Sequence, residues 1–183
     1  MWALLERLIE IIIEDPPRPT PVAGDHAAVL LIDMQDHFVR QLDTVERARI
    51  IAGQCEIIRQ CAARDIPLLV IELVGFGETL DILKKDIEKV LRTIPITKSG
   101  GDAFYGSDLE QELRSLARTT LILMGVNASC CVLDTAFTAR ALGFNVLTAD
   151  NLIADDWRYH REWKRRDWYE KNGTFFETPI VLT

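Results

Sequence analysis

Gly125-Val126-Asn127-Ala128-Ser129-Cys130-Cys131-Val132 is the stretch of this chain that says most about its fold and chemistry. Before it, Thr120 to Met124 (T-L-I-L-M) is a short, continuous apolar run of the kind found in buried strands. After it, Val132 to Leu142 has the pattern of a helix, and Gly143 supplies the stop signal. Cys131 is therefore predicted to lie where a strand turns into a helix.

The first turn of a helix is a favourable place for a nucleophilic thiol. It presents unpaired backbone N–H groups and a partial positive charge. That environment lowers the pKa of a thiol and offers donors to a developing oxyanion. Cys131 is thus a candidate nucleophile, but a buried core cysteine is an equally good interpretation of its position alone.

Asp33 and Lys98 follow two further predicted strands, at 27–32 and 93–97. In an open α/β sheet the carboxyl ends of parallel strands converge on one crevice, where these side chains could meet Cys131. An aspartate can take the thiol proton, and an ammonium group stabilises the thiolate. The alternatives are that Asp33 caps a helix and that Lys98 is a solvated surface charge.

Strands and helices are predicted to alternate along the chain. The pattern favours a single-domain, three-layer α/β/α fold with a central, mostly parallel, Rossmann-like doubly wound sheet of about six strands. The last strand is expected at the sheet edge, where its proline is tolerated. The predicted strands are 27–32, 67–73, 93–97, 119–124, 144–148 and 178–182, and the predicted helices are 44–64, 79–91, 107–117 and 132–142.

Three segments together resemble the signatures of a known family. They are A-A-V-L-L-I-D-M-Q-D-H-F (27–38), T-K-S-G-G-D-A-F (97–104) and G-V-N-A-S-C-C-V-L-D-T-A (125–136). In order, spacing and reactive residues they are similar to the isochorismatase-like cysteine hydrolases. The resemblance extends from Ala27 to Asp150 and weakens after that.

The resemblance implies roles for individual residues. Asp33 would be the general base, Cys131 the nucleophile and Lys98 the cation that activates it. A cis peptide bond would join Val126 to Asn127, and the N–H groups of Asn127 and Cys131 would form the oxyanion hole. The implied activity is hydrolysis of a C–N bond in a small amide or carbamoyl-type substrate, through a thioester. The family also includes vinyl-ether hydrolysis of isochorismate, which by resemblance does not need the cysteine.

The chain departs from the family pattern in ways that bear on metal binding. The family's nicotinamidases hold a metal with one Asp and two His, one of these in a D-x-H segment after the second strand. Here the segment at 70–79 reads V-I-E-L-V-G-F-G-E-T and has no His. We therefore expect no bound metal and no other cofactor. A second departure concerns the turn before Cys131. Family members often carry Thr at the position of Ala128, so a turn hydroxyl is missing here.

Further substrate-binding residues are expected beside the signature segments. Glu72 is a candidate for the pocket wall, although simple turn chemistry explains its segment equally well. Thr79 is expected to cap the helix that follows. Three aromatic residues and a second cysteine complete the candidates. The aromatics could equally be core residues. The cysteine is expected to line the pocket or the core beneath it, and it could also be a fallback nucleophile or a redox partner of Cys131. These aromatics and this cysteine are Phe38, Phe104, Tyr105 and Cys130.

Composition excludes several classes of function. The chain has 183 residues, enough for one domain with a sizeable core. Its net charge of -7 disfavours nucleic acid and anionic membranes as partners. No apolar run is long enough to span a bilayer. The four cysteines lack the spacing of a disulfide framework, and the first residues lack the basic start of a signal peptide, so a cytoplasmic protein is expected.

Two segments fall outside the family pattern. Residues 1–25 are predicted to form an apolar helix and a proline-rich linker ahead of a hydrolase domain at 26–183. Asp155 to Glu170 holds three of the four tryptophans among mixed charges. Such segments favour packing and a homo-oligomer, a dimer or tetramer, over nucleic-acid binding. They also motivate a second hypothesis, in which the chain is a catalytically idle interaction module.

Overall fold

The structure is a computed structural model, and it describes residues 18–156, 158 and 162–183, the side chains of 162–166 excepted. Its centre is a six-stranded sheet in which every pairing is parallel. In spatial order the strands are β4 (Thr93–Lys98), β3 (Leu68–Leu73), β2 (Ala27–Ile32), β5 (Thr120–Gly125), β6 (Asn145–Ala149) and β7 (Thr174–Phe176).

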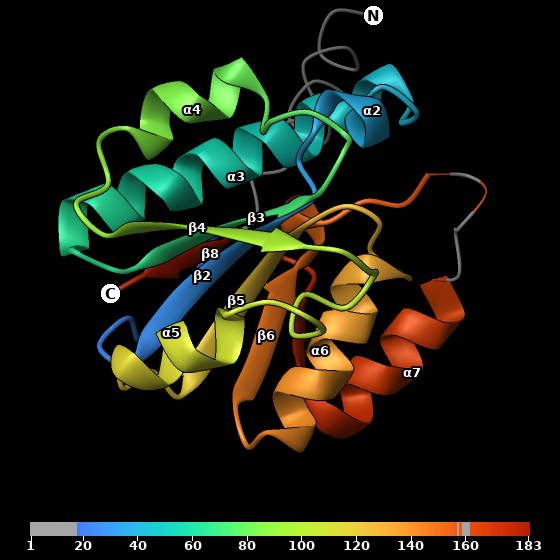
Figure 1. The fold of residues 1–183 in the computed structure, drawn as a ribbon. Helices are drawn as coiled ribbons and strands as arrows, with labels where there is room; N and C mark the ends of the chain where they lie inside the picture. The colour runs from blue at the N-terminus through green and yellow to red at the C-terminus, as the bar shows by residue number, and fades with distance from the viewer. Residues whose placement is uncertain (1–17, 157, 159–161) are drawn as a thin grey trace, which may run out of the picture.

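Helices cover both faces of this sheet (Figure 1). One face carries α3 (Thr44–Arg64) and α4 (Asp81–Ile87), and the other carries α5 (Leu109–Ser115), α6 (Cys131–Ala141) and α7 (Glu162–Asn172). Two short elements, α2 (Asp36–Val39) and the 3-10 helix η1 (Asp150–Leu152), follow β2 and β6. The predicted three-layer, doubly wound α/β fold is therefore confirmed.

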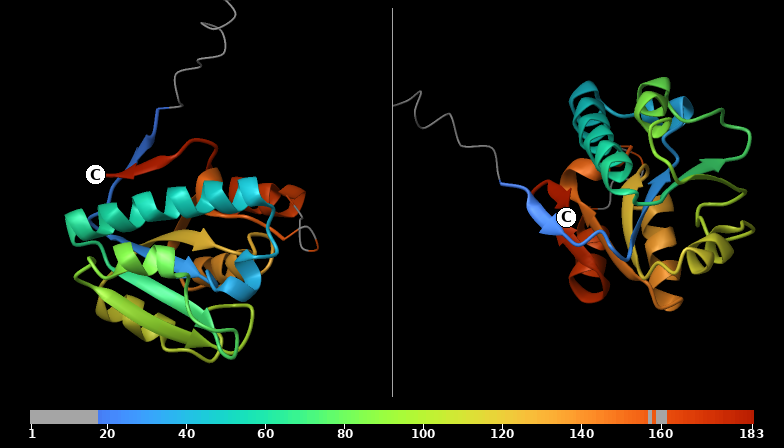
Figure 2. Two further views of the ribbon diagram at one scale, coloured as in Figure 1. Left: turned by 90° about the horizontal axis from the view of Figure 1, so that it is seen from above. Right: turned by 90° about the vertical axis from the view of Figure 1, so that its left-hand side faces the viewer.

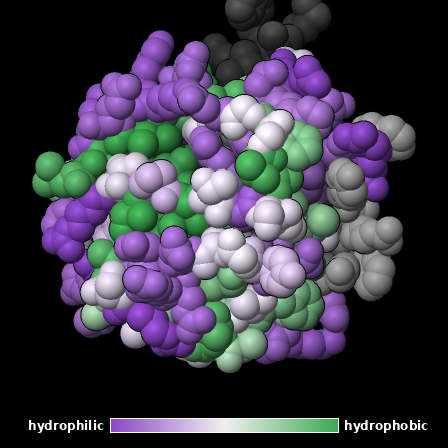
Figure 3. All heavy atoms as spheres, viewed as in Figure 1, coloured by the Kyte–Doolittle hydropathy of each residue, from purple (hydrophilic) through white to green (hydrophobic). Residues whose placement is uncertain are grey.

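The central strand β2 shows why this sequence forms a sheet of this kind. All six of its residues, A-A-V-L-L-I, are buried. A strand covered by helices on both faces needs apolar side chains at every position, not at alternate ones. At the sheet edge, β4 alternates more and contains Pro95, which an edge strand tolerates because it has a neighbour on one side only. Apolar side chains gather along this edge, between the hydrophilic surfaces of α4 and α5 (Figure 3).

The strand order places a topological switch point between β2 and β5. From β2 the chain adds β3 and β4 on one side, then crosses to β5 on the other side of β2. In open α/β sheets such a reversal opens a crevice at the carboxyl ends of the two strands, where ligands bind. Asp33 follows β2 directly, and the segment Gly125 to Cys131 leaves β5 at the same edge.

The predicted position of the last strand is wrong. The strand β8 (Ile180–Leu182) pairs in parallel with β1 (Thr20–Val22) as a separate two-stranded sheet beside the main one (Figure 2). Gln60 of α3 helps to hold it there, because its Oε1 accepts the Leu182 N–H at 2.7 Å. The outer strand next to β6 is instead β7, T-F-F, which is too short to show a periodicity.

Other boundaries differ at the helix ends. The helices predicted at 79–91 and 107–117 begin later and end earlier, as α4 and α5. Thr79 does not cap α4, whose N-cap is Leu80 without a side-chain hydrogen bond. The predicted N-terminal helix, Met1–Glu14, lies outside the described residues, as do Trp157 and 159–161 of the Trp-rich segment.

Gly125 should be intolerant of any side chain, because β2 and β5 approach closely there. A Cβ at Gly125 would lie 2.0 Å from the Ile32 carbonyl oxygen, and its φ is +141°. Gly125→Ala is expected to lower the free energy of unfolding by about 3 kcal/mol, measured by urea denaturation.

Gly143→Ala is the matched control for that substitution. Gly143 also has positive φ, +91°, but a Cβ there meets no atom within 4 Å. Gly143→Ala therefore introduces only backbone strain, and it should lower the free energy of unfolding by about 1 kcal/mol. Equal losses in the two variants would contradict the close approach of the two strands.

Candidate active site

Asp33 and Lys98 form an ion pair inside the protein. Lys98 Nζ lies 2.7 Å from Asp33 Oδ2, and both side chains are almost fully buried. The same ammonium donates to the Gly101 carbonyl oxygen at 2.6 Å. Lys98 is therefore not a surface charge, and Asp33 is not a helix cap, since Gln35 occupies the N-cap of α2. A buried pair gains little net stability after desolvation, which favours a chemical reason for its presence.

Asp33 is placed by an unusual backbone conformation. Its φ is +54°, in the left-handed region, and its N–H donates to the Ile71 carbonyl oxygen at 3.0 Å. Such a conformation is unfavourable for a residue with a side chain. Neither carboxylate oxygen has a partner in full hydrogen-bond geometry among the described residues. The carboxylate is thus held by charge while its lone pairs stay available for a proton.

Cys131 joins this pair from the other side of the switch point. It is the first residue of α6, is partly exposed, and its thiol lies within hydrogen-bonding reach of the Asp33 carboxylate. The structure therefore brings Asp33, Lys98 and Cys131 together, although their places in the sequence are far apart.

The pKa values of the two acids in this cluster are both raised. Burial raises the pKa of Asp33, while the charge of Lys98 and the hydrogen bond from Cys131 oppose the rise. The pKa of the Cys131 thiol is raised first by its hydrogen bond with Cys130, then by burial and by the charge of Asp33. Lys98 opposes this too weakly to reverse it.

The expectation of a lowered thiol pKa is therefore wrong for the resting site. The helix N-terminus favours a thiolate, but burial, Cys130 and Asp33 together outweigh that effect. Cys131 is therefore a protonated thiol beside a carboxylate in this structure.

The turn between β5 and α6 is tightly folded. The peptide bond between Val126 and Asn127 is cis. The Asn127 carbonyl oxygen accepts the N–H groups of Cys130 at 3.1 Å and Val132 at 3.2 Å. Asn127 and Cys131, the predicted oxyanion donors, thus lie in one compact turn at the head of α6.

Asp155 is a site residue that the sequence did not reveal. Its carboxylate accepts the Ser129 N–H and the Ser129 hydroxyl, each at 2.6 Å. The neighbouring Ala154 carbonyl oxygen accepts the Ala128 N–H at 2.9 Å. The segment after β6 therefore clamps the turn that carries Cys131. No local pattern signals this, because the partners are 26 residues apart.

The aromatic candidates separate into different environments. Phe38 belongs to a cluster with His37 and Phe76, whose ring centroids lie 4.7 to 5.1 Å apart. Phe104 packs against Phe144 at 6.3 Å, as a core aromatic would. Tyr105 is 73% exposed. Phe38 lies in α2, just after Asp33 in the chain, so it stays a candidate for the pocket wall together with Phe76.

Glu72 holds a loop. Its Oε1 accepts the N–H of Thr79 at 2.6 Å and the Thr79 hydroxyl at 2.8 Å. Gln35 closes the same loop through the Leu73 backbone and the Gly77 carbonyl oxygen. Glu72 therefore shapes the loop between β3 and α4 through turn chemistry.

Cys130, at the N-cap of α6, contacts the Cys131 thiol.

Metal and membrane binding can be examined for the described part of the chain. Within it, no group of three or more His, Cys, Asp or Glu side chains is arranged to hold a metal ion. No helix in that part is both long and apolar enough to cross a membrane.

Comparison with known proteins decides the family. The model of the isochorismatase domain matches residues 27–163. This chain belongs to the isochorismatase family. Its members are hydrolases, so the resemblance in the three signature segments and the prediction of a hydrolase are confirmed at the level of the family.

Individual relatives are distant. An uncharacterized isochorismatase family protein, YecD from Escherichia coli O157:H7, is 41% identical over 58 residues, which are 32% of this chain and 31% of that protein. The nicotinamidase SaPncA from Staphylococcus aureus has a TM-score of 0.73 at 19% identity, covering 83% of this chain and 98% of the other. The N-carbamoylsarcosine amidase from Thermoplasma acidophilum has a TM-score of 0.71 at 19% identity, covering 85% and 98%. At these identities the two structures show a shared fold.

Alkylation of Cys131 should report on the charges around its thiol. Asp33→Asn removes a charge that raises the thiol pKa, so iodoacetamide is expected to react faster at pH 8 than in wild type. Lys98→Met removes a charge that lowers it, so the reaction should slow. Both shifts in the thiol pKa are obtained by measuring the alkylation rate as a function of pH, with the Cys131 peptide resolved by mass.

Arg47→Gln serves as a control, because it changes one charge on α3 outside this cluster and should leave the profile unchanged. Shifts of the same sign in Asp33→Asn and Lys98→Met would contradict the arrangement of charges around the thiol.

Proposed function

We propose that this protein is a cysteine hydrolase that cleaves the C–N bond of a small amide or carbamoyl-type substrate. The observation that carries the proposal is the buried cluster in which the Asp33–Lys98 pair meets the Cys131 thiol. A thiol within reach of a carboxylate that can take its proton is an arrangement suited to nucleophilic catalysis. The fold shared with an N-carbamoylsarcosine amidase and a nicotinamidase supports this class of substrate.

The first half of the reaction forms a thioester. Cys131 Sγ attacks the substrate carbonyl carbon as its proton passes to Asp33. The developing oxyanion is held by the backbone N–H groups of Asn127 and Cys131. The C–N bond then breaks, and the proton on Asp33 goes to the leaving amine. Lys98 keeps the otherwise costly buried carboxylate charged enough to act as the base.

The second half releases the product. Water attacks the thioester carbon while Asp33 takes a proton from it, and the C–S bond breaks. The proton returns to the thiolate, so the free enzyme regains a protonated Cys131 and an ionised Asp33. The products are the amine, or ammonia, and the corresponding acid. The cluster formed by His37, Phe38 and Phe76 would border the entrance and contact an apolar part of the substrate.

A vinyl-ether hydrolase of the isochorismate type is the second candidate, because the family model that matches the chain is named for that reaction. The catalytically idle module is the third. A homo-oligomer and a cytoplasmic location remain predictions of the sequence.

Cys131→Ala separates the three hypotheses. Wild type should release ammonia or amine from at least one member of a panel of primary amides and N-carbamoyl compounds. Cys131→Ala should lose roughly a thousandfold or more of that rate. Cys61→Ala is the control, since Cys61 is buried in α3 away from the cluster.

The alternatives give different outcomes. Pyruvate release from isochorismate that survives in Cys131→Ala would assign the vinyl-ether reaction. An absence of turnover on amides, N-carbamoyl compounds and isochorismate would favour the idle module and overturn the proposal.

The pH dependence of kcat/KM should show the raised pKa of Asp33. The base must be ionised, and burial raises its pKa above the ordinary value of 3.8. Activity should therefore fall as pH drops through a point above 3.8, higher than for an exposed aspartate. An acid limb at or below the ordinary value would contradict Asp33 as the base.

A further inference from the structure

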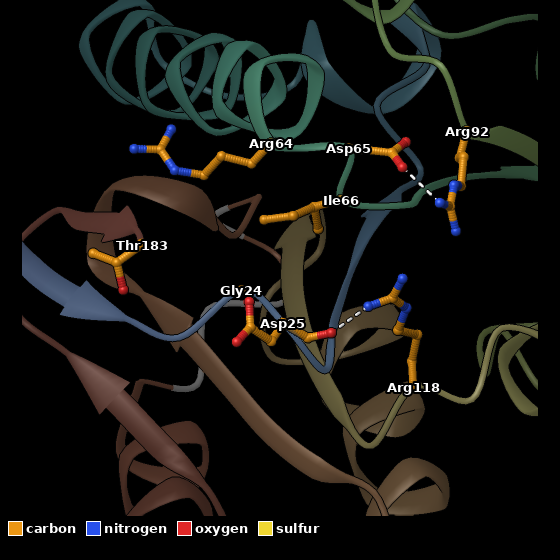
Figure 4. Close-up of a pocket in the computed structure, with 8 residues that line it drawn as sticks. All are labelled: Gly24, Asp25, Arg64, Asp65, Ile66, Arg92, Arg118 and Thr183. Carbon is orange, nitrogen blue, oxygen red and sulfur yellow. Dashed lines mark hydrogen bonds and ion pairs between the residues drawn. The ribbon is translucent and has the colours of Figure 1, made fainter.

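A cavity of about 400 Å³ lies at the amino-terminal edge of the central sheet, the edge opposite Cys131. The loops that lead into β2, β3, β4 and β5 surround it. Eight residues line it, as Figure 4 shows: Gly24, Asp25, Arg64, Asp65, Ile66, Arg92, Arg118 and Thr183. Three of them are arginines and two are aspartates, so the lining is net positive in a protein whose net charge is -7.

Arg92 and Arg118 point toward each other in this cavity (Figure 4). Arg92 is held by an ion pair with Asp65 at 2.5 Å, and Arg118 donates through Nη1 to the Asp25 carbonyl oxygen. A guanidinium has five N–H donors, so each arginine keeps donors beyond the group that holds it. Two like charges that face each other across a cavity favour an anion between them.

Arg118 Nε carries the inference further. This atom is buried and has no hydrogen-bond partner among the described residues. Buried donors are nearly always paired, so an unpaired one beside a cavity indicates a missing acceptor. A small rotation of the guanidinium toward the cavity would let Nε and one Nη bind two oxygens of the same group.

Helix dipoles explain part of this arrangement. Arg64 ends α3, and Arg92 and Arg118 follow α4 and α5, so each lies near a helix C-terminus that favours a cation. That effect accounts for the charge of the arginines. It does not account for their convergence on a cavity or for the unpaired Nε.

We propose that this cavity binds a phosphate group, either free phosphate or the phosphoryl end of a small metabolite. Arg92 and Arg118 donate to its oxygens from the two sides. Arg64 is exposed and points away from the pair in Figure 4, so it is not expected to donate to the same group. The site lies at the far end of β2 from Asp33 and is separate from the proposed catalytic cluster.

Titration calorimetry with inorganic phosphate at constant ionic strength tests the proposal on the full chain. Wild type should bind saturably. Arg118→Gln should weaken binding by about tenfold or more, because a charge-assisted donor pair is lost. Arg118→Lys should fall between the two, since it keeps the charge without the planar fork. Arg47→Gln, the same change of charge outside the cavity, should stay within about twofold of wild type.

A replacement variant and a second ligand extend the test. Should Arg118→Gln fail to fold by circular dichroism, Arg92→Gln carries the same expected loss. Tighter binding of glycerol 3-phosphate than of inorganic phosphate would assign the site to a metabolite, and the reverse order would assign it to the free anion. No saturable binding at millimolar phosphate, or an equal loss in Arg47→Gln, would overturn the proposal.

Discussion

The parallel pairing of β2 with β5 is the constraint on which the rest of this protein depends. It brings together two strands that are far apart in the sequence, and it makes their shared carboxyl edge the switch point of the sheet. The contact is so close at Ile32 and Gly125 that no side chain fits. Because of this pairing, Asp33 and the turn that carries Cys131 leave the sheet side by side. The ammonium of Lys98 then reaches them from β4.

The chemistry of the site follows from burial. In water, an aspartate, a lysine and a cysteine would titrate independently. Here the carboxylate and the ammonium stabilise each other's charge, while burial and Cys130 keep the thiol protonated. A thiol of this kind reacts when a substrate displaces water and when an oxyanion has donors to stabilise it. Under the proposed mechanism the proton leaves the thiol during the attack, so no standing thiolate is needed.

The two proposed sites lie at opposite edges of one sheet. The carboxyl edge carries Asp33, Lys98 and Cys131, the residues of the proposed catalytic cluster, with loops tied down by Gln35, Glu72 and Asp155. The amino edge carries paired arginines around a cavity. Both follow from the same parallel arrangement, because it collects all strand ends of one kind at each edge. Connections that look unrelated in the sequence are thus neighbours in space.

The sequence by itself determined five of the six strands of the central sheet, because apolar strand runs and the helical periodicity between them are local properties. It also determined the reactive residues as candidates, since Asp33, Lys98 and Cys131 each follow a recognisable strand. Only the tertiary structure decided their protonation, because pKa values depend on burial and on neighbours such as Cys130. The partner of β8, the clamp from Asp155 and the facing arginines were likewise invisible in the sequence. Each is a contact between distant segments, and local patterns carry no information about which distant segments meet.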